Sequence, residues 1–406
     1  MSEGELNLEK IYTARRRLEG VAYRTPLDYS TTFSGLTGNN VYLKLENMQK
    51  TGSFKIRGAF NKLSDLSGEE RARGVIAASA GNHAQGVAYA ATRAGIPCTI
   101  VMPEGAPISK VAATKGYGAR VVLAGGGYDE AYRAARDIQQ ESGATFIHGF
   151  NDVDVIAGQG TIALELLDEL PEMGAVLVPV GGGGLIAGVA FALKKLKPEV
   201  RVIGVQAKGA PSMQLSYTSS HIVETDKSST FADGIAIRRP GDITFDIVRS
   251  SVDEIVLVDD EEMAATILLL LERTKLVVEG AGAAGLAALL HQKVTMRGTN
   301  VVALISGGNI DMNVLSIIIR RGLSKTGRYV RIRTVLTDRP GNLRGLLAVI
   351  AKSGANVISV YHDRTKPDIP IKQAGVELAL ETHNRDHIDQ VAASLVKSGY
   401  PVEIIS

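Results

Sequence analysis

The chain has 406 residues, too many for one ordinary core, so domain-size statistics predict two or three domains. Hydrophobic residues make up 45% and charged residues 22%, a balance typical of a globular protein and not of a disordered or membrane one. The 45 basic side chains nearly match the 43 acidic ones. No excess charge is therefore present to attract nucleic acid or an anionic membrane.

The N-terminal segment and the cysteine content predict a cytoplasmic protein. The first twenty residues lack the apolar core of a signal peptide, and the apolar stretch from Ile267 to Leu271 is too short to cross a bilayer. The single cysteine, Cys98, lies in the apolar run IPCTIVM, which favours a buried strand residue over a reactive thiol and excludes an intrachain disulfide. We expect no membrane or nucleic-acid partner.

From Val41 to about Gly322, short β-branched runs alternate with alanine-rich helical patterns. This alternation is typical of an α/β fold with a mostly parallel, helix-covered sheet. Glycines are concentrated where several of the strands end, and ligands bind at the strand ends of open α/β sheets. The runs are VIAAS, CTIVM, RVVLA, AVLVPV, RVIGVQA and VVALIS.

A different pattern follows the run VLSIIIRRGLSKTGRY. From Val330 onward the sequence predicts strand, helix, strand, strand, helix and strand, the order of a ferredoxin-like βαββαβ unit. The first of these helices has leucine or isoleucine at positions 343, 346, 347 and 350, which lie on one helical face. We expect a first domain over 1–322, a linker over 323–329 and a second domain over 330–406.

The segment KTGSFKIRGAFNKL predicts a helix with Ser53 as its N-cap and Lys55 in its first turn. The partial positive charge of a helix start disfavours an ammonium group, and burial would lower the pKa of the amine further. A neutral amine can form a Schiff base. Taken alone, a first-turn lysine is more often a solvated surface charge, so neighbouring motifs must decide.

Two other helix starts carry polar or glycine-rich turns. In VIAASAGNHAQG the turn from Ser79 to Asn82 offers free amides to a carboxylate, and Asn82 could contact a phenolic oxygen on a cofactor. An ordinary capped helix is the alternative. In AVLVPVGGGGLIAG the run from Gly181 to Gly184 precedes a helix that begins at about Leu185. That arrangement favours a phosphate cradle over a flexible link, although it lacks the lysine of a P-loop.

The run VVALISGGN ends a further strand at Ser306, whose hydroxyl could contact a ring nitrogen, although a terminal serine is usually a turn former. Taken in order, SFKIRGA, SAGNHAQG, PVGGGGL and SGGN resemble the serine/threonine dehydratases, which are fold type II pyridoxal-phosphate enzymes. The similarity covers residues 10 to 320. Beyond Val330 the chain resembles an ACT regulatory domain, as in the medium-length threonine dehydratases that carry one such domain.

The resemblance implies a fold of two open α/β subdomains, the smaller formed by about residues 45–150 and inserted in the larger. It implies pyridoxal 5'-phosphate as cofactor, and the dehydration and deamination of L-threonine to 2-oxobutyrate and ammonia, with L-serine as a second substrate. A tetramer is usual in this family. The single ACT domain implies allosteric control, as expected of an enzyme that begins isoleucine biosynthesis.

The resemblance also assigns roles by position. Lys55 is the Schiff-base lysine that also removes the Cα proton, and Phe54 packs against one face of the cofactor. Asn82 bonds the ring 3-hydroxyl, and Ser306 bonds the ring nitrogen. The remaining positions are those implied for the cofactor phosphate, Gly181, Gly182, Gly183, Gly184 and Leu185, and for the substrate carboxylate, Ser79, Ala80, Gly81, Asn82 and His83.

Other functions stay open. A β-replacement synthase usually has a TSGNT-like substrate loop, whereas SAGNH here favours a dehydratase. Serine racemase and hydroxyaspartate dehydratase are further alternatives, but Ala80 replaces the serine that racemases use as an opposite-face acid or base. A non-catalytic amino-acid sensor is disfavoured by the intact Lys55. We expect no metal, because Gln206, Ala210 and Ser212 stand where related enzymes place cation ligands, two of them carboxylates.

The segment TDRPGNLRGLLAVI predicts an effector site in the second domain. A helix-start turn can take a carboxylate, Asp338 could take an ammonium group, and Asn356 could assist if another domain packs alongside. Isoleucine is the first candidate effector, with valine or a nucleotide next. The alternative is that the turn only leads into the helix and the domain drives assembly. The residues of the predicted site are Asp338, Pro340, Gly341, Asn342 and Asn356.

Overall fold

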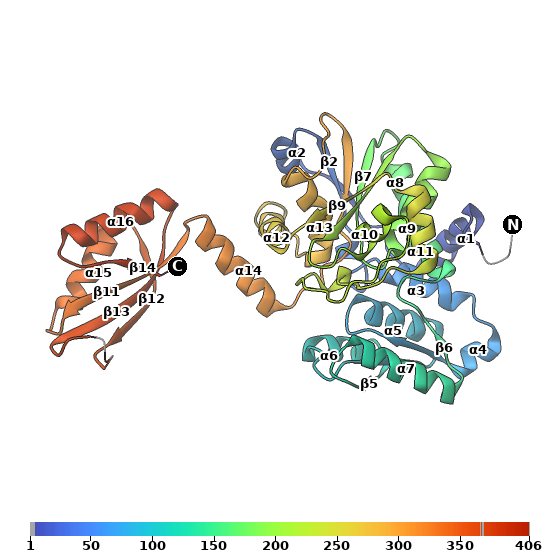
Figure 1. Ribbon diagram of the computed structural model, residues 1–406, viewed down its shortest axis with the longest axis horizontal. Coiled ribbons are helices and arrows are strands. Elements are labelled where there is room, and N and C mark those ends of the chain that lie inside the picture. The colour runs from blue at the N-terminus through green and yellow to red at the C-terminus, as the bar shows by residue number, and fades with distance from the viewer. Residues whose placement is uncertain (1–4, 366, 368, 406) are drawn as a thin grey trace. The chain divides into compact units, whose positions relative to one another are not determined.

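The computed structural model describes residues 5–365, 367 and 369–405. The chain forms two compact units, Met1–Ile310 and Asp311–Ser406. The first unit contains two sheets and the second contains one (Figure 1). Within the described residues, no helix is both long and apolar enough to span a membrane.

The larger sheet of the first unit has the strand order β1-β2-β10-β7-β8-β9. Its strands run parallel except β1, which pairs antiparallel with β2. The central strand β7 is buried along its whole length, as expected for a parallel strand covered on both faces. The strands are β1 (Leu27–Tyr29), β2 (Asn40–Lys44), β7 (Ala175–Pro179), β8 (Arg201–Ala207), β9 (Glu254–Val258) and β10 (Asn300–Leu304).

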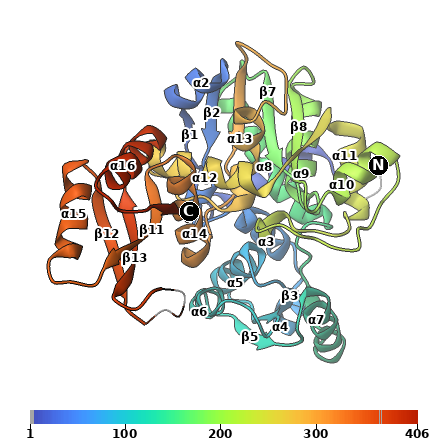
Figure 2. The same cartoon turned by 60° about the vertical axis from the view of Figure 1, so that its left-hand side comes forward.

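The smaller sheet is fully parallel and has the order β5-β4-β3-β6. Its residues lie between β2 and β7 in the sequence, and helices α5, α6 and α7 flank it (Figure 2). The predicted runs VIAAS, CTIVM and RVVLA form three of its strands, which confirms the alternating pattern. The strands are β3 (Val75–Ala78), β4 (Cys98–Met102), β5 (Arg120–Leu123) and β6 (Thr145–Phe146).

Helices cover both sheets of the first unit. Helix α3, which begins with Lys55, packs against α5 from the smaller half and α8 from the larger half. The helical elements in the smaller half and its approach are η1 (Glu46–Met48), α3 (Lys55–Ser64), α4 (Gly68–Arg73), α5 (Asn82–Ala94), α6 (Ile108–Gly116) and α7 (Tyr128–Ser142). The others are α1 (Leu8–Leu18), α2 (Thr31–Thr37), α8 (Val153–Glu169), α9 (Gly184–Leu196), α10 (Ser212–Ser219), η2 (Asp233–Ile235), α11 (Asp242–Ser251), α12 (Asp260–Thr274) and α13 (Gly280–Leu290).

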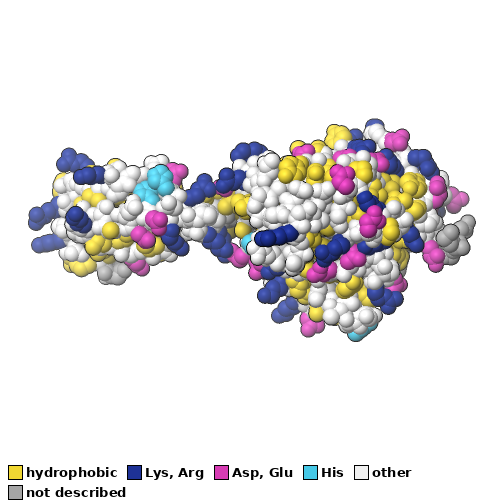
Figure 3. Space-filling model, turned by 90° about the horizontal axis from the view of Figure 1, so that it is seen from above, with side chains coloured by type: hydrophobic (Ala, Val, Ile, Leu, Met, Phe, Trp, Pro, Cys, Tyr) yellow, Lys and Arg dark blue, Asp and Glu magenta, His cyan; other side chains and the backbone are white. Residues whose placement is uncertain are grey.

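The two halves have separate apolar cores. One core joins α8, α9 and strand β7 in the larger half, and the other joins α3, α5 and strands β3 and β4 in the smaller half. Cys98 belongs to the second core, and burial raises the pKa of its thiol to about 12. This confirms the expectation of a buried strand residue. On the face of the first unit drawn in Figure 3, basic and acidic side chains are interspersed.

The second unit contains the predicted βαββαβ order after a first helix. Its antiparallel sheet has the order β12-β13-β11-β14, and the side chains of Leu346 and Ile350 pack into its core. The elements are α14 (Met312–Lys325), β11 (Tyr329–Thr337), α15 (Asn342–Lys352), β12 (Asn356–Asp363), β13 (Gln373–Glu381), α16 (Arg385–Lys397) and β14 (Glu403–Ile404).

The boundary between the units differs from the one expected after residue 322. It falls between Ile310 and Asp311, and the Asp311 side chain accepts a hydrogen bond from the Asn313 amide at the start of α14. Helix α14 packs on β11, so this segment is the first element of the second unit. The helix also continues to Lys325, into the range 323–329 expected as a linker.

Candidate active site

The segment before Lys55 pairs with the end of strand β10. The backbone of Ser53 forms an isolated β-bridge with Gly307, and the Phe54 amide donates to the Ser306 carbonyl oxygen at 3.2 Å. The predicted capping role of Ser53 is wrong. Phe54 occupies the N-cap position without a side-chain cap, because Ser53 is held in the extended pairing one residue earlier. The buried Ser53 hydroxyl has no hydrogen-bond partner among the described residues.

The Lys55 amine lies in surroundings that disfavour its charged form. Its Nζ donates to the Gly149 carbonyl oxygen at 2.7 Å and lies 5.2 Å from the centre of the Phe54 ring. Burial lowers the pKa of this amine from 10.5 to about 8, although the carboxylate of Glu279 acts to raise it. A substantial fraction of the amine is therefore neutral at a pH near 8, as a nucleophile or base requires.

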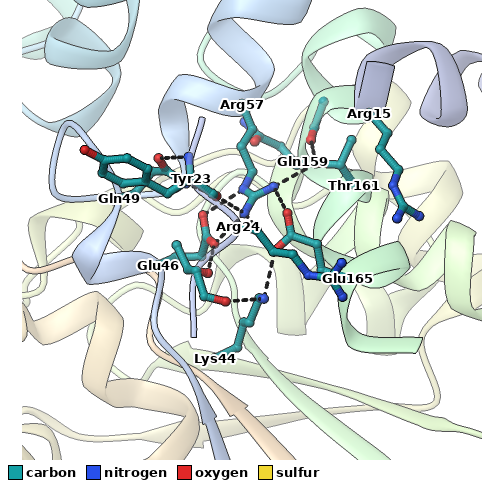
Figure 4. Close-up of polar contacts among 12 residues, drawn as sticks. Arg15, Tyr23, Arg24, Lys44, Glu46, Gln49, Arg57, Gln159, Thr161 and Glu165 are labelled. Carbon is teal, nitrogen blue, oxygen red and sulfur yellow. Dashed lines mark hydrogen bonds and ion pairs between the residues drawn. The ribbon is translucent and has the colours of Figure 1, made fainter. Parts of the chain in front are cut away.

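A buried ion network holds the body of helix α3 (Figure 4). Arg57 forms two hydrogen bonds with Glu46, at 2.8 and 2.9 Å, and two with Glu165, at 2.6 and 3.0 Å. Burial acts to raise the pKa of Glu46, but the charge and hydrogen bonds of Arg57 outweigh it and lower that pKa. The network joins η1, α3 and α8 beneath the turn that carries Lys55.

The predicted substrate loop lies at the start of α5. The Ser79 hydroxyl accepts from the Gly81 amide at 3.1 Å, and α5 begins at Asn82 without a side-chain cap. A Cβ atom built on Gly81 would meet nothing within 4 Å, so the space beside this turn is open. Ala80 packs at the edge of the smaller core. The free amides of the helix start are thus available to an anion.

Two histidines border the same region in neutral form. His83 Nε2 lies 2.8 Å from the Ile147 carbonyl oxygen, while His148 Nδ1 accepts from the amides of Phe150 and Asn151. Burial, assisted by the positive charge of Lys55, lowers the pKa of His83 to about 3 and that of His148 to about 4. Neither ring therefore adds positive charge at neutral pH.

Gly181, Gly182 and Gly183 lie between β7 and α9, and Gly184 is the first residue of α9, one residue before the predicted helix start. A Cβ atom on Gly182 would lie 2.5 Å from the Phe150 ring, and one on Gly184 would lie 2.9 Å from Phe150 atoms. Gly183 has a φ of +99°, which favours glycine, and a Cβ there would lie 2.6 Å from Met213. Helix α9 begins at Gly184, and the amides of its first turn have no partner within the helix. The loop therefore offers amides at a crowded turn.

Asn82 lies in a chain of side-chain hydrogen bonds. Its Nδ2 donates to Glu279 Oε1 at 2.7 Å, and its Oδ1 accepts from Asn309 Nδ2 at 2.7 Å. Asn309 Nδ2 also donates to the Thr51 carbonyl oxygen at 2.8 Å. A Cβ on Gly307 would lie 2.3 Å from Glu279 Oε1 and 3.1 Å from Asn82 Nδ2, so the loop after β10 closes against both. Burial raises the pKa of Glu279 to about 7.

These contacts bring the four sequence motifs together. Lys55 reaches Gly149, whose neighbour Phe150 lies against the glycine loop, and Asn82 meets the loop that follows Ser306. Sequence reasoning missed the segment from His148 to Phe150, together with Glu279 and Asn309. The only signal for Glu279 was an isolated carboxylate between two valines and a glycine-rich helix, in VVEGAGAAG.

The residues considered for a cation lie at the end of β8, in the loop after it and at the start of α10. Gln206 Oε1 accepts from the Gln214 amide at 2.9 Å, the Ser212 hydroxyl donates to the Ile237 carbonyl oxygen at 2.7 Å, and Ala210 is buried. Within the described part of the chain, no group of three or more His, Cys, Asp or Glu side chains could hold a metal ion. That the enzyme needs no metal stays a prediction.

The residues predicted for an effector lie in the second unit at two ends of its sheet. Asp338 pairs with Arg364 at 2.8 Å, and Asn342 Nδ2 donates to the Thr337 carbonyl oxygen at 2.7 Å, where β11 ends. Gly341 has a φ of +95° and precedes α15. Asn356 instead lies opposite Glu381, which also pairs with the first residue of β11. A single copy of this unit therefore does not bring Asn356 to the loop that contains Asp338 and Pro340.

Comparison with known proteins adds independent findings. Residues 18–307 match the family described as pyridoxal-phosphate dependent enzymes. The chain is 53% identical to an L-threonine ammonia-lyase of Thermotoga maritima, over 98% of this chain and all of that protein. Among solved structures, threonine deaminase isoform 2 of Solanum lycopersicum is 38% identical with a TM-score of 0.73, covering 78% of this chain and 92% of that one. Maize serine racemase is 36% identical with a TM-score of 0.74, covering 79% and 98%.

Proposed function

The chain belongs to the pyridoxal-phosphate-dependent enzyme family, and from this premise we propose how its residues carry out the reaction of a threonine ammonia-lyase. The enzyme is a lyase that uses pyridoxal phosphate and converts L-threonine to 2-oxobutyrate and ammonia. Water leaves first, and hydrolysis of the released aminocrotonate takes up water and frees ammonia. The observation that carries the assignment of roles is the Lys55 amine, whose lowered pKa suits both covalent attachment and proton transfer.

The residues present fit this cofactor. The amides of Gly181 to Gly184 and Leu185 would hold its phosphate at the start of α9. Glycine is needed in this loop because a Cβ on Gly182, Gly183 or Gly184 would collide with Phe150 or Met213. The Asn82 amide has two Nδ2 hydrogens. One is donated to Glu279, so the second remains available to the ring oxygen. Ser306 would meet the ring nitrogen, and Phe54 would pack against a ring face. When bound, the cofactor supplies an electron sink for negative charge at the substrate Cα.

Each remaining role belongs to a side chain or amide of this chain. The helix start from Ser79 to His83 would bind the substrate carboxylate in the open space beside Gly81. The neutral Lys55 amine would take the Cα proton. His83 and His148 stay uncharged, so they leave Lys55 as the titrating group among the basic side chains named here. L-serine carries the same leaving hydroxyl, and we propose it as a second substrate.

Serine racemase is a second candidate because of the structural likeness to the maize enzyme. Racemisation needs a proton donor on the face of the substrate opposite the lysine, and Ala80 cannot transfer a proton. We therefore expect elimination to dominate. Cα proton removal by Lys55 then leads to loss of the hydroxyl, not to proton return on the other face.

A substrate panel tests this function. The full-length enzyme with pyridoxal phosphate is incubated with L-threonine or L-serine and no added thiol, and 2-oxoacid and the chirality of remaining serine are measured. We expect 2-oxobutyrate from threonine, pyruvate from serine and little D-serine. D-serine that forms as fast as pyruvate would show a racemase, and a requirement for thiol would show a β-replacement synthase.

We also propose that residues 330–406 form an ACT domain that regulates the enzyme through isoleucine. The turn from Asp338 to Asn342 offers a carboxylate, a helix start and a left-handed glycine. Because Asn356 lies at the other end of the sheet, a complete site needs a second subunit alongside, which supports a homo-oligomer such as a tetramer. An effector must bind the active and inactive states differently, by about 1–3 kcal/mol in typical cases.

Deletion of residues 329–406 tests the regulatory proposal. The shortened enzyme should keep its cofactor at Lys55 and lose any response to isoleucine. The comparison is the threonine saturation curve with and without millimolar isoleucine, in both forms. An unchanged curve for the full-length enzyme would exclude isoleucine, and valine and nucleotides would then be compared in the same assay.

A further inference from the structure

Glu279 is a carboxylate that the proposed roles leave unassigned. It is the N-cap residue of α13, yet it forms no side-chain cap there, and its Oε1 accepts from Asn82 Nδ2 at 2.7 Å. A Cβ on Gly307 would approach this same oxygen to 2.3 Å, and one on Gly234 would approach it to 3.5 Å. The loop after β10 and the element η2 thus close around the carboxyl group, and its side chain is directed to the cofactor-binding residues.

The charged groups that face Glu279 come from three elements. Lys55 lies on α3, Lys110 on α6 and Asp233 on η2, where Lys110 and Asp233 form an ion pair of 2.9 Å. Burial is the largest effect and raises the pKa of Glu279 to about 7, although Asn82, Lys110 and Lys55 act to lower it. Near neutral pH the carboxyl group is therefore close to half protonated, which is unusual for a glutamate.

The orientation of the Asn82 amide is fixed on both sides. Asn309 donates to its oxygen at 2.7 Å, so that oxygen is occupied, and Glu279 accepts one of its two Nδ2 hydrogens. The remaining hydrogen is the only polar hydrogen of the side chain still available to the ring oxygen of the cofactor. A donor at this position favours a deprotonated ring oxygen. Glu279 and Asn309 together therefore determine which atom Asn82 presents.

We propose that Glu279 is a positioning residue that works as an uncharged carboxylic acid, holding the Asn82 amide toward the cofactor while adding no negative charge to the site. The inference rests on the proposed function, because that function places Asn82 beside the cofactor ring. Deprotonation of Glu279 then opposes cofactor binding. Pyridoxal phosphate binding is consequently coupled to retention, or uptake, of one proton by this side chain.

Electrostatics explain why the neutral form is the working one. The cofactor brings an anionic phosphate and a partly anionic ring oxygen, and the substrate adds a carboxylate. A further negative charge on Glu279 would repel all three, and the opposite charge of Lys110 is already paired with Asp233. A protonated carboxyl group keeps one oxygen as acceptor for Asn82 without this repulsion.

The test compares wild type with Glu279→Gln, which reproduces the neutral acceptor and cannot titrate. The cofactor-free full-length chain is titrated with pyridoxal phosphate from pH 6 to 9, and the dissociation constant is measured by absorbance. At pH values above the pKa of Glu279, the ratio of the wild-type dissociation constant to the Glu279→Gln dissociation constant should increase with pH. The increase should approach about tenfold per pH unit. Lys55 titrates in both proteins, but the Glu279 charge acts to raise the Lys55 pKa, so the Lys55 titration is measured separately in each protein and included in the comparison.

A ratio that stays constant from pH 6 to 9 would overturn the proposal. So would cofactor binding by Glu279→Gln that is more than about tenfold weaker at every pH, because that result would mean that the negative charge is required. Threonine turnover by wild type tests the proposed function separately. The affinity ratio requires no turnover, so either idea can fail alone.

Infrared spectroscopy of the wild-type holoenzyme keeps the proposal testable if Glu279→Gln does not fold. A protonated carboxylic acid has a carbonyl stretch distinct from that of a carboxylate. We expect this band to persist in the holoenzyme from pH 6 to 9, because the bound cofactor retains the Glu279 proton, and to shift in position in Glu279→Asp. Absence of the band throughout the pH range would contradict a protonated Glu279.

Discussion

Lys44 and Lys55 both belong to the first unit, where Lys44 is the last residue of β2 and Lys55 is the first residue of α3. The side chain of Lys44 has no solvent exposure, and its Nζ contacts the Glu165 carboxylate at 2.8 Å and the Thr25 carbonyl oxygen at 2.7 Å. Within the described residues, Lys55 Nζ donates to a single carbonyl oxygen, that of Gly149, and burial lowers the pKa of the amine to about 8. The same side chain is a paired ion in one place and a partly neutral amine in the other.

The difference teaches that partners, and not burial alone, decide whether a lysine is structural or reactive. Glu165 also pairs with Arg57, so Lys44 belongs to the ion network under α3 (Figure 4). In the part of the chain that the structure describes, no carboxylate of this network forms an ion pair with Lys55. The ion network therefore fixes helix α3 through Arg57, while Lys55, the first residue of this helix, forms no ion pair with the network.

The largest expected effect comes from breaking the network at Arg57. In Arg57→Met the carboxylates of Glu46 and Glu165 lose the guanidinium that bonds both, and an unpaired buried charge is costly. We expect the free energy of unfolding to fall by about 3–5 kcal/mol in urea at pH 7. The matched control is Asp168→Asn, which breaks the exposed pair with Arg15 and should cost less than about 1 kcal/mol. Equal losses in the two variants would contradict the distinction.

A smaller effect of opposite sign is expected at Lys55. The folded state lowers the pKa of this amine from 10.5 to about 8, so the charged form is disfavoured in the folded chain. The penalty is fully present below pH 8 and disappears as the pH rises through 10.5, because the unfolded chain then also loses the proton. In the cofactor-free protein, Lys55→Met should be about 1–3 kcal/mol more stable than wild type at pH 7.

The contrast with Lys44 sharpens this prediction. Lys44→Met removes a partner of Glu165 and should destabilise the cofactor-free protein at the same pH. Stability is measured by urea unfolding at pH 7 and again at pH 10. A gain for Lys55→Met that persists unchanged at pH 10 would show that its cause is packing, not the lysine charge.

The smallest expected difference in the free energy of unfolding is between a substitution in the glycine loop and one in the substrate loop. A Cβ on Gly182 would overlap the Phe150 ring, whereas a Cβ on Gly81 would meet open space. Gly182→Ala should lower the free energy of unfolding by about 1–2 kcal/mol, while Gly81→Ala should change it by less than about 0.5 kcal/mol. If Gly81 borders the substrate, its variant should instead raise the KM for threonine. Equal destabilisation by both changes would remove the distinction between the loops.

The sequence could predict the parts of the site that are continuous in the chain. Lys55 lies in the first turn of a helix that the sequence predicts, and Gly181 to Gly184 follow a strand and lead into a helix, so the local pattern was enough for both. The alternation of strands and helices predicted the parallel sheets for the same reason. The βαββαβ order of the second unit could also be predicted, because its strands and helices have clear apolar periodicities.

The contacts between distant segments could not be predicted in this way. Gly149 receives the Lys55 hydrogen bond from 94 residues away, and Glu279 meets Asn82 across 197 residues. Neither follows from periodicity or capping rules. The Ser53 cap failed for a similar reason, since pairing with Gly307 at the end of another strand overrode the local signal. The unit boundary was displaced because α14 packs on β11.

The most direct test of the central claim is to locate the lysine that carries the cofactor. The wild-type holoenzyme is treated with borohydride, digested and mapped by mass spectrometry. The reduced cofactor should be found on Lys55, and Lys55→Ala should carry none and form no 2-oxobutyrate from threonine. Cofactor found on Lys44 or another lysine, or undiminished turnover by Lys55→Ala, would contradict the account.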